Sequence, residues 1–211
     1  MPLRGIMSKI VIRSCSEDTT RERILKAAIL RFSAHSYEAT GLRDLAADVG
    51  VDISYVHRCF GSKENLFREA VRAVARPERL FGGDGEDLSN DLAKEILAKK
   101  DGNEVRPLDI VIRSFSSPDA SRVLRDLLLA DFIAPLTRKR EGVSDRQAAL
   151  IAGFMMGVGI LKDVIGAEPL LGSENALLEI MARTIEEILS GGSGDSRRND
   201  SSSSFTEKKS R

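Results

Sequence analysis

The stretch VDISYVHRCF, residues 51–60, brings reactive side chain types close together. His57 and Cys59 could serve as metal ligands, or as a base and its nucleophile. Residues two apart on an α-helix, however, lie about 200° apart around the axis and cannot share a face. The other histidine and cysteine, His35 and Cys15, have no motif spacing relative to this pair. The sequence therefore predicts no metal site, no catalytic site and no cofactor.

This stretch belongs to a group of short predicted helices. A helix over about residues 42–49 has apolar residues at 3.6-residue spacing and stops at Gly50, a residue type favoured just after a helix. Asp52 is then a good N-cap for the helix that holds the stretch itself. One helix starting near Thr19 precedes this pair, and one capped by Ser62 follows it. Two short helices joined by a tight turn form a helix-turn-helix, whose second helix can enter the major groove of DNA.

Helical patterns continue through the rest of the chain, and only residues 9–13, KIVIR, alternate as a short strand would. The fold class is therefore predicted to be all-α. The Arg76-Pro77 step breaks the fourth helix, and a loop with three glycines follows it. The predicted organisation is a flexible arm over 1–18, the helix-turn-helix domain over 19–76, a second helical domain over 77–190 and a disordered Gly/Ser-rich tail over 191–211. The later helices are expected at about 89–100, 107–115, 118–137, 144–165 and 173–190.

Composition limits the partners and the location. The 211 residues include 32 basic and 32 acidic side chains, but residues 1–81 carry 14 Lys/Arg against 10 Asp/Glu, a net charge of +4. A mildly basic amino-terminal third fits a module that binds the phosphates of double-stranded DNA. Two cysteines fit a reducing cytoplasm, and no secretory signal is visible. The longest apolar run, residues 148–161, is shorter than the ~20 residues of a membrane span, so no membrane association is predicted.

Several motifs between Thr20 and Phe67 follow one another in a characteristic order: RERILKAA, YEAT, LRDLA, VGV, YVHRCF and SKENLF. In this order the sequence resembles the TetR family of transcriptional repressors, without a gap. The segment RQAALIAGFMMGVGILKDVIGAEPL is similar, more diffusely, to a carboxy-terminal helix of one TetR subgroup. The resemblance implies a DNA-binding domain followed by a helical domain for effector binding and dimerisation. It also implies a ligand-responsive, dimeric repressor of a palindromic operator, and not an enzyme.

The resemblance also implies which side chains contact DNA. Arg43 would reach a base or a phosphate, Lys63 would bind the phosphate backbone, and His57 would take the role of the family's usual tyrosine. Arg58 is our own candidate for a phosphate or a guanine, although Arg58 and Lys63 also read as solvated surface charges. The predicted DNA-binding set, with Arg58 added to the residues that the resemblance implies, is Thr40, Gly41, Arg43, Ile53, Ser54, Tyr55, His57, Arg58 and Lys63.

Some of these positions depart from the family pattern. Gly41 stands where a serine or threonine usually caps the second helix and touches a phosphate, and Asp52 replaces a common serine cap. Cys59 stands where tyrosine or histidine is usual. These departures motivate an alternative, in which the chain is a TetR-like protein-interaction module with weakened DNA contacts.

The second domain has two implied roles. An effector pocket, suited to a small apolar or amphipathic molecule, would be lined by Phe81, Leu108, Ile112, Phe115, Leu127, Leu128, Phe132, Met155 and Met156, which also read as ordinary core residues. A homodimer interface would use the last two long helices, with Gly153, Gly157, Leu177, Met181 and Ile188 as candidates. Glycine at helical spacing lets a partner helix approach closely, although it also fits a kink in a core helix.

Overall fold

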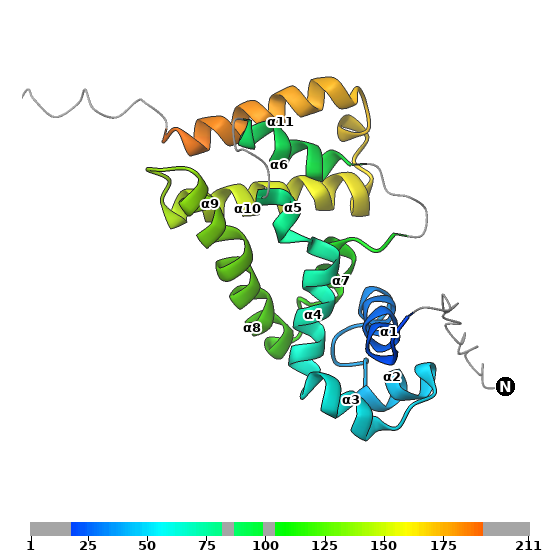
Figure 1. Cartoon of the computed structure of the whole chain (residues 1–211). Helices are drawn as coiled ribbons and strands as arrows, with labels where there is room; N and C mark the ends of the chain where they lie inside the picture. Colours follow the sequence, from blue (N-terminus) through cyan, green and yellow to red (C-terminus); the bar gives the residue numbers. More distant parts are fainter. Residues whose placement is uncertain (1–17, 82–86, 99–103, 192–211) are drawn as a thin grey trace, which may run out of the picture.

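A computed structural model describes residues 18–81, 87–98 and 104–191 (Figure 1). These residues form helices and connecting turns with no strand among them, so the predicted all-α class is confirmed. Apart from Asp18 and Gly191, the predicted amino-terminal arm, the predicted tail and the alternating residues 9–13 lie outside the described residues.

The amino-terminal helices begin and end at the residues that the sequence indicates. Thr19 and Glu22 form a reciprocal capping box at the first helix, and Asp52 and Ser62 accept hydrogen bonds from backbone N–H groups at the third and fourth. Gly50 ends the second helix in the left-handed region, with φ 73°. The four helices are α1 Thr20–Ala34, α2 Leu42–Val49, α3 Ile53–Phe60 and α4 Lys63–Ala75.

The first core joins these helices through aromatic rings. Phe32, Tyr37 and Phe67 contact one another with ring centroids 4.9 to 6.0 Å apart, and all three are buried. Leu45 and Val56 bring α2 and α3 into the same core. Because these inward positions are filled, the opposite face of α3 is left to solvent.

The remaining helices pack above this unit and follow the predicted ranges closely (Figure 1). The predicted helix 118–137 is continuous but contains one π-helical turn, and so does the predicted helix 144–165. The elements are α5 Pro77–Phe81, α6 Leu88–Leu97, α7 Pro107–Ser114, α8 Pro118–Leu127, the π-turn η1 Leu128–Ile133, α9 Ala134–Lys139, α10 Asp145–Gly159, the π-turn η2 Ile160–Ile165, the 3-10 turn η3 Glu168–Leu170 and α11 Glu174–Leu189.

The short helix α5 was not predicted. Arg76 ends α4 in the left-handed region, with a positive φ of 45°, and the chain then turns directly into α5. Proline suits the first position of a helix because its missing N–H would have no partner there. The sequence signal of Pro77 therefore fits a new helix as well as a loop.

A second core lies among α6, α9, α10 and α11, and α6 packs along α11. The Glu186 carboxylate on α11 joins this unit. It accepts a hydrogen bond of 2.6 Å from the Ser89 hydroxyl on α6. It also forms an ion pair with the guanidinium of Arg140, which follows α9, at an N–O distance of 2.5 Å. The two cores do not divide at residue 76, because Ile110 and Val123 of α7 and α8 are buried in the first core.

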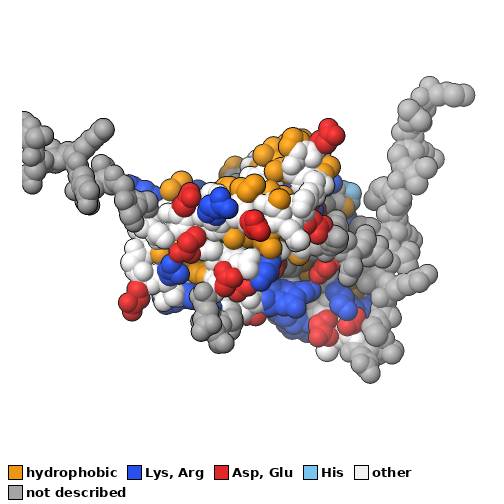
Figure 2. All heavy atoms as spheres, turned by 90° about the horizontal axis from the view of Figure 1, so that it is seen from above, with side chains coloured by type: hydrophobic (Ala, Val, Ile, Leu, Met, Phe, Trp, Pro, Cys, Tyr) orange, Lys and Arg blue, Asp and Glu red, His pale blue; other side chains and the backbone are white. Residues whose placement is uncertain are grey.

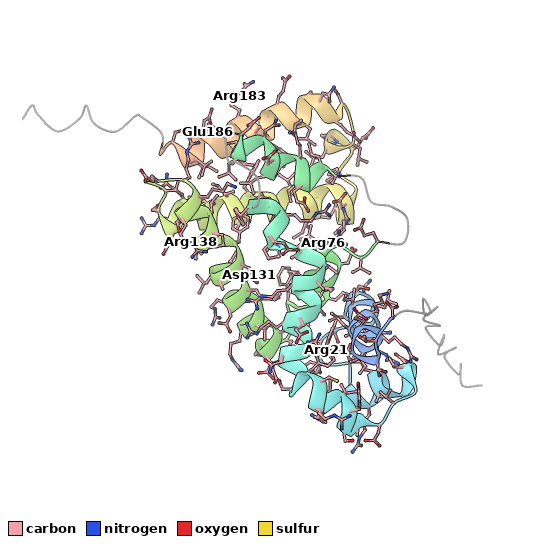
Figure 3. All side chains as sticks on the ribbon, viewed as in Figure 1. Arg21, Arg76, Asp131, Arg138, Arg183 and Glu186 are labelled. Carbon is pink, nitrogen blue, oxygen red and sulfur yellow. The ribbon has the colours of Figure 1, made fainter. Side chains whose placement is uncertain are left out.

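Two arginines on α4 and one just after it pair with acidic side chains of the segments that surround the helix. Arg68 pairs with Asp126 of α8 at 3.2 Å, and Arg72 holds both carboxylate oxygens of Asp131 in η1 at 2.6 and 2.8 Å. Arg76, just after α4, lies 3.6 Å from Glu104. Figure 3 labels two of these residues, Arg76 at the end of α4 and Asp131 in η1.

Candidate nucleic-acid interface and effector cavity

The outer face of α3 is open to solvent. Ser54, His57 and Arg58 are exposed, whereas Val56 and Phe60 on the opposite face are buried. The predicted contacts Ile53 and Tyr55 are half-buried and lean on the first core. This separation of faces leaves a polar and basic surface on a short helix of the size that fits a major groove.

Two side chains on this face are already oriented. The Arg58 guanidinium carbon lies 4.7 Å from the centroid of the Tyr55 ring, a cation–π contact. His57 Nδ1 lies 3.1 Å from the Gly61 carbonyl oxygen. Since a carbonyl oxygen only accepts, Nδ1 donates here in the neutral ring, and Nε2 is left as an acceptor.

The start of α2 offers one exposed cation and no capping side chain. Arg43 is exposed, and Gly41 occupies the N-cap position without a side-chain hydrogen bond. Thr40 is fully buried, and its hydroxyl donates to the Ser36 carbonyl oxygen at 3.1 Å. The Thr40 side chain therefore has no exposed surface in this structure, which favours a structural role for its hydroxyl.

Lys63 begins α4 but is partly committed within the protein. Its Nζ lies 4.1 Å from the centroid of the Tyr37 ring, and burial lowers the pKa of this ammonium. The neighbouring Glu64 carboxylate occupies the same first turn, where hydrogen bonds from a backbone N–H and from Ser62 lower its pKa. A phosphate at this helix start would share the site with Glu64.

The reactive residues of the α3 stretch do not converge on a metal. Cys59 is a free thiol, half-buried against the first core, while His57 is exposed. No group of three or more His, Cys, Asp and Glu side chains that could hold a metal ion occurs among the described residues.

Two adjacent cavities lie between α4, η1 and the helices around them, with volumes of about 400 and about 380 Å³. Both are bounded by Leu128, Phe132 and Met156, so they share a wall. The predicted pocket residues found in one or both linings are Leu108, Phe115, Leu127, Leu128, Phe132, Met155 and Met156. Phe81 and Ile112 are absent from both linings, and the Phe81 ring instead packs on Phe132 with centroids 5.6 Å apart.

Sequence reasoning missed the charged residues of the first cavity. Arg106 and Asp163 line it together with the exposed Arg79 and Glu95. They arise from segments far apart in the sequence, and no local motif marks them. Arg106 and Asp163 form a half-buried ion pair, which the sequence could not predict because its two residues meet only in the folded chain.

An apolar surface runs over α10, η2 and α11. Leu150 is 58 % exposed and Ile180 is 57 % exposed, and a Cβ added at Gly153 or Gly157 would meet no atom of the subunit within 4 Å. Figure 2, viewed from the α11 side, shows hydrophobic side chains gathered along this part of the surface. Met181, also predicted for the dimer interface, is 1 % exposed and belongs to the second core of the subunit.

The other two predicted interface side chains, Leu177 and Ile188, are half-buried against the second core. Asp145–Ile165, which is α10 with η2, is long and apolar enough to cross a membrane by length and composition, with a mean hydropathy of 1.8. One such helix is weak evidence of a membrane span, and 22 % of the apolar window is buried inside the protein, Ile151 and Met155 of the helix among the buried residues.

Two family models match the chain. The model of bacterial regulatory proteins of the tetR family matches residues 24–70, and that of the tetracyclin repressor-like C-terminal domain matches residues 86–189. The chain belongs to the TetR family. As a member it is a DNA-binding regulator of transcription, and TetR-family regulators are not enzymes.

Solved structures share this fold. A TetR-family regulator of Streptomyces coelicolor A3 is 25% identical, with a TM-score of 0.54, over 85% of this chain and 99% of its own. NalD, the secondary repressor of the MexAB-OprM multidrug efflux pump in Pseudomonas aeruginosa, is 23% identical, with a TM-score of 0.58, over 78% and 95%. A transcriptional regulator of Rhodococcus sp. Rha1 is 24% identical, with a TM-score of 0.57, over 82% and 97%. No curated protein matches the chain.

Proposed function

We propose that this TetR-family regulator is a dimeric repressor that binds a palindromic operator and releases it when a small molecule fills the cavity beside α4. The observation that carries the proposal is the exposed outer face of α3. Ser54, His57 and Arg58 are available there for base edges and phosphates, because Val56 and Phe60 hold the helix to the first core. A DNA-binding regulator acts where the chromosome lies, so we place it in the cytoplasm.

Dimerisation would give the repressor its palindromic site. One helix-turn-helix reads a half-site, and a twofold dimer sets two recognition helices about one turn of DNA apart. The exposed apolar surface of α10 and α11, with Leu150, Gly153 and Ile180, is the face that a second copy would cover. An uncovered apolar surface of this kind is costly in water, which favours its burial between subunits.

The α4 helix would couple the cavity to the DNA. Its first half packs in the core that supports α3, and Val71, Val74 and Ala75 of its second half line the cavities. A molecule that favours a different position of α4 would change the spacing of the two recognition helices in a dimer. Operator affinity would then fall by the same factor by which the operator weakens effector binding.

Selection of bound sequences from random double-stranded DNA tests the operator. We expect one enriched palindromic site, because both subunits of a dimer present the same helix. Recovery of no common sequence at moderate salt, or of a single unrepeated half-site, would contradict the proposed operator.

Salt titration of binding to the selected site tests the contacts. Arg43→Ala and Arg58→Ala should each weaken binding and reduce the log–log salt slope by about one for each phosphate that is no longer neutralised. Arg138→Ala is the matched control, since Arg138 is exposed on α9 at the other end of the molecule (Figure 3). Equal affinities for all three variants and the wild type would remove α2 and α3 from the interface.

A second candidate function is a protein-interaction module with weakened DNA contacts. Asp52 is exposed at the start of α3, where a hydrogen bond from Ser54 lowers the pKa of its carboxyl and so keeps it ionised. With Glu64 at the start of α4, two carboxylates lie near the position expected for phosphates. A flat salt dependence would favour this candidate, because binding to phosphates releases counterions and protein contacts of mixed charge do not.

A further inference from the structure

A tyrosine and an arginine form a stacked pair on the outer face of α3. The Tyr55 ring is half-buried against the first core, and the Arg58 guanidinium carbon lies 4.7 Å from the centroid of that ring. Residues three apart on a helix are neighbours on its surface, so the pair fits a regular α3. Because the core restricts the ring, the ring can restrict the exposed guanidinium that lies over it.

The stack directs Arg58 toward the amino-terminal half of α3. Tyr55 precedes Arg58 by three residues, and side chains on helices generally extend toward the preceding turn. In a helix-turn-helix, residues near the amino terminus of the second helix contact base edges. The neighbouring His57 ring is held at the other end, because its Nδ1 lies 3.1 Å from the carbonyl oxygen of Gly61, the residue after α3. Of these two side chains, Arg58 is therefore the one directed at base edges.

The stack occupies the face of the guanidinium and leaves its edge open. That edge carries five N–H donors, and a guanidinium accepts no hydrogen bond. Within residues 18–81, 87–98 and 104–191, the Arg58 side chain forms no ion pair and donates no hydrogen bond. Apart from water, an acceptor for these donors has to come from outside these residues.

Arg21 of α1 provides a comparison within the same domain (Figure 3). Its guanidinium carbon lies 4.6 Å from the centroid of the Phe60 ring, which is a stack of the same kind. Arg21 also donates to both carboxylate oxygens of Glu69 on α4, at 2.8 and 2.5 Å, so its charge is balanced. Arg58 is stacked in the same way, but its donors and its charge remain available for a ligand.

The chemistry of these donors selects one base. A group that only donates needs acceptors, and guanine presents two neighbouring acceptors, O6 and N7, at its major-groove edge. Adenine presents one acceptor beside a donor, which opposes a second N–H group. Phosphate oxygens accept as well, but a phosphate contact carries no sequence preference, and this difference can be measured.

We propose that Arg58 reads a guanine in each half of the operator, and that Tyr55 is a positioning residue whose ring directs the guanidinium at that base. This inference rests on the proposed function, because it requires an operator. It gives Tyr55 a role that acts through Arg58, in place of a base contact of its own.

Sequence selection with the wild type and with Arg58→Ala identifies the base. We expect the wild type to select one G·C pair in each half-site for which Arg58→Ala has no preference, while the other positions stay unchanged. Exchanging that pair for A·T in both half-sites should weaken wild-type binding about tenfold or more, and should hardly affect the variant. An equal loss of affinity for every sequence in Arg58→Ala would show a phosphate contact and would overturn the inference.

Two substitutions of Tyr55 separate its ring from its hydroxyl. Tyr55→Phe keeps a ring under the guanidinium and should keep the discrimination between G·C and A·T. Tyr55→Leu keeps an apolar side chain against the core, removes the ring, and should lower this discrimination about two- to fivefold. In an Arg58→Ala background, Tyr55→Leu should cost no further operator affinity. Wild-type discrimination in Tyr55→Leu, a loss in Tyr55→Phe, or a further loss in the double variant would each overturn the positioning role.

Arg21→Gln is the matched control, because it removes a stacked arginine that is already paired with Glu69. Its discrimination between G·C and A·T should equal that of the wild type. A loss as large as that of Arg58→Ala would show that α3 responds to the removal of either stacked arginine, and would overturn the assignment of the base contact to Arg58.

The selection also separates this inference from the proposed function. A palindromic operator whose base preferences all survive Arg58→Ala would keep the repressor and overturn the guanine contact. Recovery of no operator by the wild type would overturn both.

Discussion

At the scale of one residue, a substitution of Thr40 can distinguish a structural role from a DNA contact. Its hydroxyl is buried and donates to the Ser36 carbonyl oxygen, so Thr40→Val should lower the free energy of unfolding by about 1 kcal/mol. Operator affinity of the folded variant should stay unchanged, because no part of the side chain reaches the surface. Urea unfolding and operator titration measure the two effects, and Thr40→Ser, which keeps the hydroxyl, is the control. A tenfold loss of operator affinity in a fully stable Thr40→Val variant would restore Thr40 to the interface.

Local signals explain which site residues could be predicted. The Asp52 cap and the inward spacing of Val56 and Phe60 set the face of α3, so Ser54, His57 and Arg58 were placed correctly on its outer side. The burial of Thr40 was not predicted, because family resemblance marks a position in the sequence and not the direction of its side chain. The Arg106–Asp163 pair was missed because it joins residues 57 apart.

At the scale of elements, α4 is bound to η1 by the Arg72–Asp131 pair. The guanidinium holds both carboxylate oxygens, and these hydrogen bonds raise the pKa of Arg72. Because Arg72 is 46 % exposed, we expect a modest coupling of about 0.5–1 kcal/mol between Arg72→Ala and Asp131→Ala in a double-mutant cycle of unfolding. Arg122→Ala with Asp119→Ala, a pair within α8, is the control for a contact that joins no second element. Additive effects at Arg72 and Asp131 would show that the pair does not hold α4 in place.

The packing of α6 on α11 should depend on pH through Glu186. Its pKa is lowered below 4.5, first by the hydrogen bond from Ser89 and also by the charge of Arg140. A lowered folded-state pKa stabilises the fold above the unfolded value of 4.5, and this stabilisation is lost as the pH falls through the folded-state pKa. Glu186→Gln should therefore be less stable than the wild type at pH 7 by roughly 0.5 kcal/mol, after allowance for solvent screening. Urea unfolding from pH 7 down to pH 3 should show the difference closing below about pH 4.5. Glu187→Gln, exposed on the same helix, should show no such closure.

Elements were predicted well because caps and periodicity are local. The residues of α10 and η2 follow one apolar pattern, so their combined span was expected, whereas the π-turn within it was not. A π-turn keeps helical dihedral angles and changes only the hydrogen-bond partner, so residue spacing carries little trace of it. The division of the buried residues into two cores could not be predicted from local signals either. Ile110 and Val123 pack in the same core as residues of α1 and α4, which lie far away in the sequence.

At the scale of the whole molecule, Gly153 decides whether the apolar face of α10 is free or covered. A Cβ at this position meets nothing within the subunit, so on a free surface Gly153→Ala should raise stability by about 1 kcal/mol through helix propensity alone. If a partner helix packs closely there, the added methyl instead crowds the interface, at a typical cost of about 1–3 kcal/mol. We expect the second result, seen as a dimer dissociation constant about tenfold higher or more.

Sedimentation over a range of concentrations measures that constant, and operator binding should weaken in parallel because only a dimer reads both half-sites. Ile180→Glu, which places a charge on the same exposed face, is the positive control for loss of the dimer, and Leu129→Glu, on the exposed side of η1, should leave it intact. The sign of the effect at Gly153 makes the result decisive. A more stable protein with an unchanged dissociation constant would mean that the two copies meet elsewhere, and that the glycine spacing of α10 serves no close approach.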